Sequence, residues 1–144
     1  MISPLVMLVD DEVPFVETMT KRLGKRGVKV ISAYGGQEAL EKLNTNRNVD
    51  VVILDVKMPG MDGIETLQEI KQQHPLVEAI MLTGHATVET AIMGMRLGAF
   101  DYLMKPCEMA QLLAKVEDAT KKKREHEEKI REAKVKELIS RHGW

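Results

Sequence analysis

The sequence predicts an α/β protein: a doubly wound, five-stranded parallel sheet with five helices, and a helical extension at the carboxyl end. Short apolar runs of strand length alternate with longer stretches in which apolar residues recur at helical spacing. This alternation is typical of a parallel sheet covered by helices on both faces. The 144 residues suffice for one domain with a buried core.

Five apolar runs are the expected strands. Residues 51–54 are all apolar with a β-branched bias, which indicates a buried strand that stops at Asp55. Residues 28–32 alternate between apolar and polar, which indicates a more exposed strand. The expected strands are residues 5–9, 28–32, 51–54, 76–82 and 99–104.

Each expected strand is followed by an expected helix whose apolar residues lie on one face. For the third helix, Asp62 is well placed as the N-cap, after a loop that Pro59 and Gly60 impose. The apolar faces, in chain order, are Phe15, Val16, Met19 and Leu23; Ala39, Leu40 and Leu43; Ile64, Leu67 and Ile70; Val88, Ala91, Ile92 and Met95; and Met109, Leu112, Leu113 and Val116.

Charge and cysteine content limit the class of protein. The formal net charge is −1, so bulk charge does not indicate a polyanion-binding protein. The single cysteine, Cys107, excludes an internal disulfide and fits a reducing compartment. Neither a signal peptide nor an apolar run of membrane-spanning length is apparent. We therefore expect a cytoplasmic protein without membrane association.

Residues 121–144 differ from the rest and are expected to form a charged helical tail on a domain of residues 1–120. They carry a net charge of +4 and contain no glycine before Gly143. Glutamates precede lysines or arginines by four residues at several positions, which stabilises a helix. The apolar stripe is too thin for a strong coiled-coil prediction. We expect the basic residues 121–124 to form a solvated face, with nucleic-acid contact as the alternative.

Polar side chains follow the ends of four expected strands. If the strand order is 2-1-3-4-5, the acids after the first and third strands converge where open α/β sheets bind ligands. Clustered carboxylates repel one another, so either a pKa rises or a cation such as Mg²⁺ binds. Acids, a metal, a lysine and a hydroxyl are the groups needed to transfer a phosphoryl group to a carboxylate. The residues are Asp10, Asp11, Asp55, Thr83 and Lys105.

Four motifs, in order, resemble a response regulator receiver domain of two-component signalling. They are VDDE at residues 9–12, LDVKMPGMDG at 54–63, LTG at 82–84 and DYLMKP at 101–106. The resemblance as a whole extends over about residues 3 to 120. The resemblance implies a flavodoxin-like fold with strand order 2-1-3-4-5 and a phosphoprotein.

The resemblance implies a metal site and a modified residue. Asp55 resembles the aspartate that accepts the phosphoryl group. Asp10 and Asp11 resemble the acidic pair that, with Asp55, holds Mg²⁺, and Asp11 would be a direct ligand. The backbone carbonyl of Lys57 would be a further ligand.

The resemblance also implies a switch. Thr83 and Lys105 resemble the residues that contact the phosphoryl oxygens, and Tyr102 resembles the aromatic that rotates inward when Thr83 moves. Met93, off the apolar face of its helix, is a candidate contact residue. Pro106 would follow a cis peptide bond.

By this resemblance the chain is a signalling switch and not an enzyme. A sensor histidine kinase or a histidine phosphotransfer protein would transfer a phosphoryl group to Asp55, and the surface around the fourth helix, fifth strand and fifth helix would change. The downstream protein target is left open, and homodimerisation is a further alternative. Direct DNA binding is not expected, because the tail is too short for a DNA-binding domain.

Three alternatives compete with this interpretation. An aspartate at a strand end is often only a helix cap, which applies to Asp10, Asp11 and Asp55. A haloacid-dehalogenase-type phosphohydrolase would have a second acid two residues after its nucleophile, where this chain has Lys57. A flavin- or nucleotide-binding module would have a phosphate loop rich in glycine or hydroxyl residues after the first strand, where this chain has three acids.

Overall fold

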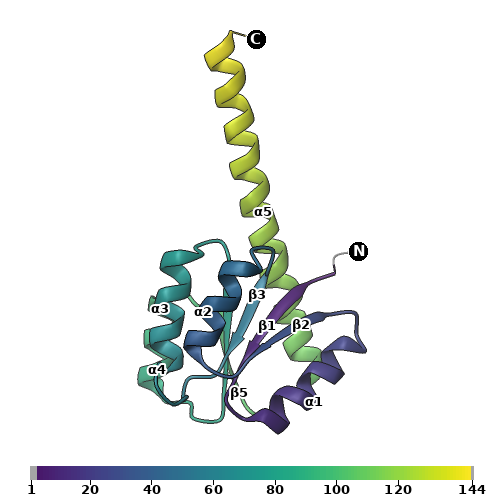
Figure 1. The fold of residues 1–144 in the computed structure, drawn as a ribbon, viewed down its shortest axis with the longest axis vertical. Helices are drawn as coiled ribbons and strands as arrows, with labels where there is room; N and C mark the ends of the chain where they lie inside the picture. Colours follow the sequence, from purple (N-terminus) through teal and green to yellow (C-terminus); the bar gives the residue numbers. More distant parts are fainter. Residues whose placement is uncertain (1–2, 144) are drawn as a thin grey trace.

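Five parallel strands form one sheet in the predicted order, β2-β1-β3-β4-β5, in a computed structural model that describes residues 3–143 (Figure 1). Every connection between the strands contains a helix. The strands are β1 Leu5–Val9, β2 Lys29–Ala33, β3 Val51–Leu54, β4 Glu78–Thr83 and β5 Asp101–Met104. The helices are α1 Val13–Gly24, α2 Gly36–Thr45, α3 Gly63–Gln73, α4 Val88–Arg96 and α5 Met109–His142.

The core consists of two apolar layers, one on each face of the sheet. Successive strand residues point to opposite faces, so β1 and β3 contribute to both layers and β3 is buried throughout. One layer packs under α2 and α3, and the other packs under α1 and α5. This doubly wound arrangement confirms the predicted fold class.

Three strands begin one or two residues later than predicted, because the residues before them bond to helix ends or turns, and β2 and β4 also end one residue later. Ala99 donates to the carbonyl of Gly94 at the end of α4, so β5 begins at Asp101 and not at residue 99. Val77 donates to His74 in a turn, so β4 begins at Glu78 and ends on Thr83 itself. Val28 donates to Leu23 at the end of α1, so β2 begins at Lys29.

Helix α5 is continuous from the sheet into the charged tail, and its second half projects away from the sheet (Figure 1). Its first half is amphipathic and buries Leu112, Val116 and Ala119. Its last part exposes Val135 and Leu138. Trp144 lies outside the described residues. Between residues 3 and 143 no helix is both long and apolar enough to cross a membrane.

The expectation of a solvated basic face is wrong for Lys123, which is buried, and holds only in part for Arg124, whose side chain is 39% exposed. Asp50, just before β3, is 2% exposed and accepts hydrogen bonds from the backbone of Leu5 at 2.9 Å and from Arg124 at 3.0 and 3.2 Å. The Lys123 ammonium lies 3.3 Å from the same carboxylate and is buried with it. This cluster of Asp50, Lys123 and Arg124, hereafter the Asp50 clamp, fastens the tail to the amino edge of the sheet.

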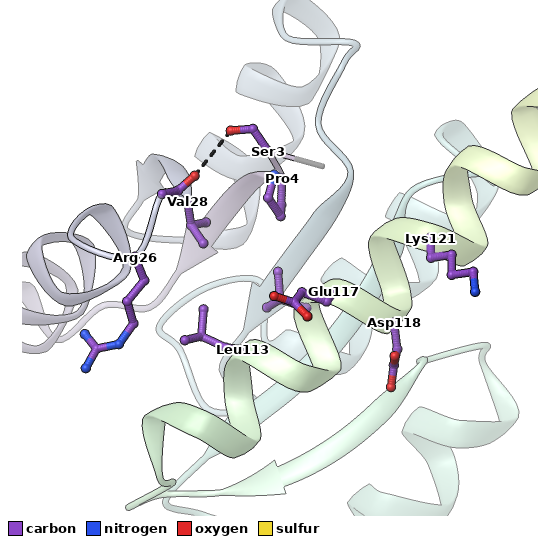
Figure 2. Close-up of a pocket in the computed structure, with 10 residues that line it drawn as sticks. Ser3, Pro4, Arg26, Val28, Leu113, Glu117, Asp118 and Lys121 are labelled. Atoms are coloured by element: carbon purple, nitrogen blue, oxygen red, sulfur yellow. Dashed lines mark hydrogen bonds between the residues drawn. The ribbon is translucent and has the colours of Figure 1, made fainter. Parts of the chain in front are cut away.

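A groove runs along one flank of α5, below the Asp50 clamp. Figure 2 shows this groove between α5 and the chain that joins α1 to β2, with Leu113 and Glu117 on one wall and Val28 on the other. Packing on this flank is therefore incomplete. At the end of the groove, Arg124 also donates to the carbonyl of Ser3 at 3.1 Å.

The Asp50→Asn substitution should loosen the start of the tail. Burial alone would raise the pKa of Asp50, but hydrogen bonds from Arg124 and Leu5 outweigh it and hold the pKa below its usual 3.8. A lowered carboxyl pKa means that the stabilisation is present at neutral pH and is lost as the pH falls below about 3.8. Removing one member of a buried ion pair should lower the free energy of unfolding by about 2–4 kcal/mol at pH 7.

Hydrogen exchange of the amides of residues 120–130 measures the loosening directly. We expect faster exchange there in Asp50→Asn than in the matched control Glu125→Gln, which neutralises an exposed acid of the same helix. Equal protection in both variants would contradict a clamping role for Asp50.

Candidate functional site

Three predicted acids meet at the carboxyl edge of the sheet because β1 and β3 are neighbours in register. Val9 pairs with Leu54, so the residues that follow them, Asp10 and Asp55, lie side by side. The backbone NH of Asp55 donates to the carbonyl of Val9 at 3.0 Å. Carboxylate oxygens of Asp10, Asp11 and Asp55 all lie within 4.8 Å of one another. This cluster could hold a metal ion.

Lys105 supplies positive charge to the cluster from the end of β5. Its ammonium lies 2.6 Å from Asp10 Oδ2, 3.3 Å from Glu12 Oε1 and 3.7 Å from Asp55 Oδ2. Burial would lower the pKa of Lys105, but the hydrogen bond to Asp10 and the neighbouring acids raise it, so the side chain stays cationic. The predicted cis peptide bond joins Lys105 to Pro106.

The charges of the cluster are incompletely balanced. Burial raises the pKa of Asp10 above its usual 3.8, although the hydrogen bond from Lys105 opposes this. Asp55 is 2% exposed, and its Oδ1 is buried with no hydrogen-bond partner among the described residues. A buried carboxylate oxygen without a donor is costly unless a ligand completes its coordination.

Asp55 forms part of the wall of an open pocket at this edge. The lining comes from the loops after β1, β3 and β4: Asp11, Glu12, Asp55, Lys57, Met58, Pro59 and His85. A second depression beside it shares Lys57 and His85 and extends to the start of α4. The pocket therefore connects the buried Asp55 side chain to solvent.

The β3–α3 loop is folded tightly against Asp55. A Cβ at Gly63 would lie 1.9 Å from the backbone oxygen of Asp55, so only glycine fits there. Asp62 caps α3 through the NH of Glu65 at 2.8 Å, which confirms the predicted N-cap. The loop thereby carries Lys57 to the pocket.

The hydroxyls of the other two predicted residues, Thr83 and Tyr102, make hydrogen bonds to residues other than the acids. Thr83 is fully buried, and its hydroxyl accepts a hydrogen bond from the NH of His85 at 3.0 Å. Tyr102 is partly buried against the core, and its hydroxyl lies 2.8 Å from Thr90 Oγ1 on α4. Tyr102 thus connects β5 to α4, and its role as a switch stays a prediction.

Sequence reasoning assigned no role to two neighbours of Lys105. Glu12 belongs to the VDDE motif, and its acidity beside Asp10 and Asp11 was the available signal. Phe15 lies with its ring centroid 4.0 Å from the Lys105 ammonium. The sequence predicted Phe15 only as part of the apolar face of its helix, and no local sequence pattern predicts its contact with Lys105.

A parallel sheet in this order, with three acids and a lysine at its carboxyl edge, defines a class of signalling domain. The chain belongs to the response regulator receiver domain family, whose model matches residues 6–117. The solved receiver domain from Clostridium thermocellum is 34% identical in sequence, with a TM-score of 0.80, and the alignment covers 84% of this chain and 97% of that one.

Curated relatives are regulators that contain this domain as one part. The DNA-binding transcriptional regulator NtrC of Escherichia coli K12 is 36% identical over 115 residues, which are 80% of this chain and 24% of that protein. The transcriptional regulatory protein ZraR of Escherichia coli O157:H7 is 38% identical over 114 residues, which are 79% of this chain and 26% of that protein. The chain thus spans about a quarter of the length of these relatives.

The Asp10→Asn substitution should stabilise the protein at neutral pH when divalent cations are chelated. The pKa of Asp10 is higher in the folded protein than its unfolded value of 3.8, so its contribution to stability falls as the pH rises through the interval between these two values. Asparagine removes the buried charge, and Lys105 retains Glu12 and Asp55 as partners.

We expect a higher unfolding temperature for Asp10→Asn than for the wild type at pH 7 in chelator, and a smaller difference near pH 4. The matched control is Asp50→Asn, because the pKa of that buried acid is shifted the opposite way and its loss should lower the unfolding temperature. A lower unfolding temperature for Asp10→Asn at pH 7 would show that the Lys105 contact outweighs the burial of charge.

Proposed function

We propose that this chain is the phospho-accepting switch of a two-component system, and that Asp55 accepts the phosphoryl group. The observation that carries the proposal is the buried Oδ1 of Asp55, which has no hydrogen-bond donor within residues 3–143 and lies beside two further acids at an open pocket. The family membership of residues 6–117 supports it.

The donor set at this edge suits Mg²⁺. Carboxylates of Asp10, Asp11 and Asp55 and the backbone carbonyl of Lys57 would hold the cation, since Mg²⁺ prefers a few hard oxygen ligands and retained waters. When bound, Mg²⁺ neutralises clustered carboxylates and the negative charge of the phosphoryl oxygens. The unpartnered oxygen of Asp55 is what such a ligand would satisfy.

In the proposed reaction an Asp55 carboxylate oxygen attacks the phosphorus of a phosphohistidine. The phosphorus–nitrogen bond breaks, its electron pair stays on the imidazole, and an acyl phosphate forms. Lys105, whose ammonium is already 3.7 Å from Asp55, would donate to the phosphoryl oxygens. Hydrolysis of the acyl phosphate would return the chain to its starting state, so its own turnover is slow self-dephosphorylation and not catalysis on a separate substrate.

The phosphohistidine would belong to a sensor histidine kinase or a histidine phosphotransfer protein. NtrC is described as DNA-binding, but only the receiver portion of that protein matches this chain. We therefore propose protein contacts as the output and no direct DNA contact by residues 1–144. A homodimer is compatible with this output.

The proposed readout is the face formed by α4, β5 and the first half of α5. An acyl phosphate on Asp55 would bond the hydroxyl of Thr83 in one of two states and shift the equilibrium between them. Thr83 would then give up its bond to the NH of His85, which leads into α4. Large apolar side chains are exposed on this face: Val88, Ile92, Met93, Met95 and Met104.

Asp55→Asn should abolish phosphorylation by acetyl phosphate. Intact mass spectrometry should show one phosphoryl group on the wild type with Mg²⁺ and none with chelator. Asp11→Asn should slow the reaction at least about tenfold, since it removes a charged ligand of the cation. Asp50→Asn is the matched control, a buried aspartate at the other edge of the sheet, and should react as the wild type does. Full labelling of Asp55→Asn would refute the assignment.

Amide chemical shifts should report the switch. With Mg²⁺ and beryllofluoride, a phosphoryl mimic, we expect changes at Met93, Asp101 and Met104 as well as around Asp55. Thr83→Ala should bind the mimic yet lose the distant changes, while α2 serves as an internal reference that stays unchanged. Changes confined to the loops around Asp55 would contradict the proposed readout.

A further inference from the structure

Phe15 contacts the reactive cluster without belonging to its acids or its lysine. We infer that the aromatic ring of Phe15 is a positioning residue that confines the Lys105 ammonium beside Asp10 and Asp55. The inference rests on the proposed function of Asp55 for its consequence in phosphoryl transfer. That Phe15 confines the Lys105 ammonium does not depend on the proposed function.

The position of Phe15 follows from how α1 begins. The chain leaves β1 through Asp10, Asp11 and Glu12, and Phe15 follows in the first turn of α1. This brings the ring centroid to 4.0 Å from the Lys105 ammonium, well within the distance of about 6 Å at which a cation is attracted to an aromatic face. The lysine side chain is only 15% exposed, so water weakens this attraction less than it would at the surface.

Unlike the acids, the ring of Phe15 can hold the Lys105 ammonium while that ammonium exchanges its hydrogen-bond acceptors. Lys105 donates to Asp10 at 2.6 Å and to Glu12 at 3.3 Å, whereas Asp55 lies beyond hydrogen-bond distance at 3.7 Å. To stabilise a phosphoryl group on Asp55, the ammonium must exchange one of these acceptors for a phosphoryl oxygen. Attraction to a ring face has no single acceptor atom, so it persists while the hydrogen bonds exchange.

Glu12 makes such confinement necessary. Its side chain is 60% exposed, so it offers the ammonium an acceptor on the solvent side that competes with the buried acids. A flexible lysine holds its position only where neighbouring groups limit its rotamers. Phe15 supplies an apolar wall at this point, 4.0 Å from the ammonium.

Simple core packing is the competing explanation, and the chain provides a matched control for it. Its two phenylalanines, Phe15 and Phe100, both pack partly buried against the same core layer under α1 and α5. Phe100 also has a cation nearby, Lys122 at 5.7 Å, but that pair belongs to the amino edge of the sheet, near Glu78. Loss of aromatic packing alone should therefore have similar effects at both positions.

The test compares Phe15→Leu, Phe15→Tyr and Phe100→Leu with the wild type. The first readout is hydrogen exchange of the Lys105 ammonium by NMR, with the signal assigned through its loss in Lys105→Met. The second readout is the rate of phosphorylation by acetyl phosphate with Mg²⁺. The unfolding temperatures of the same variants distinguish an effect on the position of Lys105 from an effect on stability.

For Phe15→Leu we expect ammonium exchange about fivefold faster and phosphorylation about fivefold slower, in keeping with the loss of one cation–π contact. Phe15→Tyr keeps a ring face and should stay within about twofold of the wild type in both readouts. Phe100→Leu should lower the unfolding temperature and leave both readouts unchanged. If Phe15→Leu does not fold, Phe15→Met replaces it, since methionine fills irregular gaps and also lacks a ring.

Wild-type ammonium exchange in Phe15→Leu, or equal changes in Phe100→Leu, would overturn the inference. If the wild type itself is not phosphorylated on Asp55, the proposed function fails. The ammonium exchange of the variants still decides whether Phe15 positions Lys105, so the two failures are distinguishable.

Discussion

The pairing of β1 with β3 imposes the constraint on which the site depends. With Val9 opposite Leu54, the chain has to place Asp10 and Asp55 side by side in a poorly solvated position. Two buried carboxylates repel each other, and a single lysine from β5 compensates them only in part. The raised pKa of Asp10 and the unpartnered oxygen of Asp55 are two consequences of this one arrangement. Groups held in this strained balance are suited to bind a cation or to react.

The buried aspartates at the two ends of β3 have opposite surroundings. Asp50 precedes β3 and receives donors from Leu5, Lys123 and Arg124, which hold its pKa below the usual value. Asp55 follows the same strand and lacks a donor on Oδ1 within the described part of the chain. The difference lies in what surrounds each carboxylate and not in the residue type. Asp50, whose carboxylate has several hydrogen-bond donors, links the tail to the sheet. Asp55 keeps one oxygen without a donor among the described residues.

Local patterns in the sequence were sufficient for the α/β class and for the polar residues at the strand ends, whereas the strand order that brings the acids together came from the resemblance to receiver domains. Alternating apolar runs define the strands, and polar residues at strand ends converge wherever parallel strands are neighbours. Contacts between distant residues left no such pattern. Lys123 lies 73 positions from Asp50, and a run of four basic residues looks the same whether solvated or buried. The ring of Phe15 likewise packs against the core and contacts Lys105. The helical spacing of apolar residues predicts the core packing but not the contact with Lys105.

The Asp50 clamp lies where α5 leaves the domain, at the opposite end of the strands from Asp55, so it would be the pivot of any tilt of this helix. About 20 residues of helix extend beyond Lys123, which at 1.5 Å per residue is an arm of about 30 Å. A tilt of about 10° at the pivot would displace the tip of such an arm by about 5 Å. Because α5 is one continuous helix and not two helices joined by a linker, a rotation of its first half on the sheet would also move the tail. A change in the tilt of α5 on the sheet would therefore appear at the end of the tail as a translation of about one helical turn.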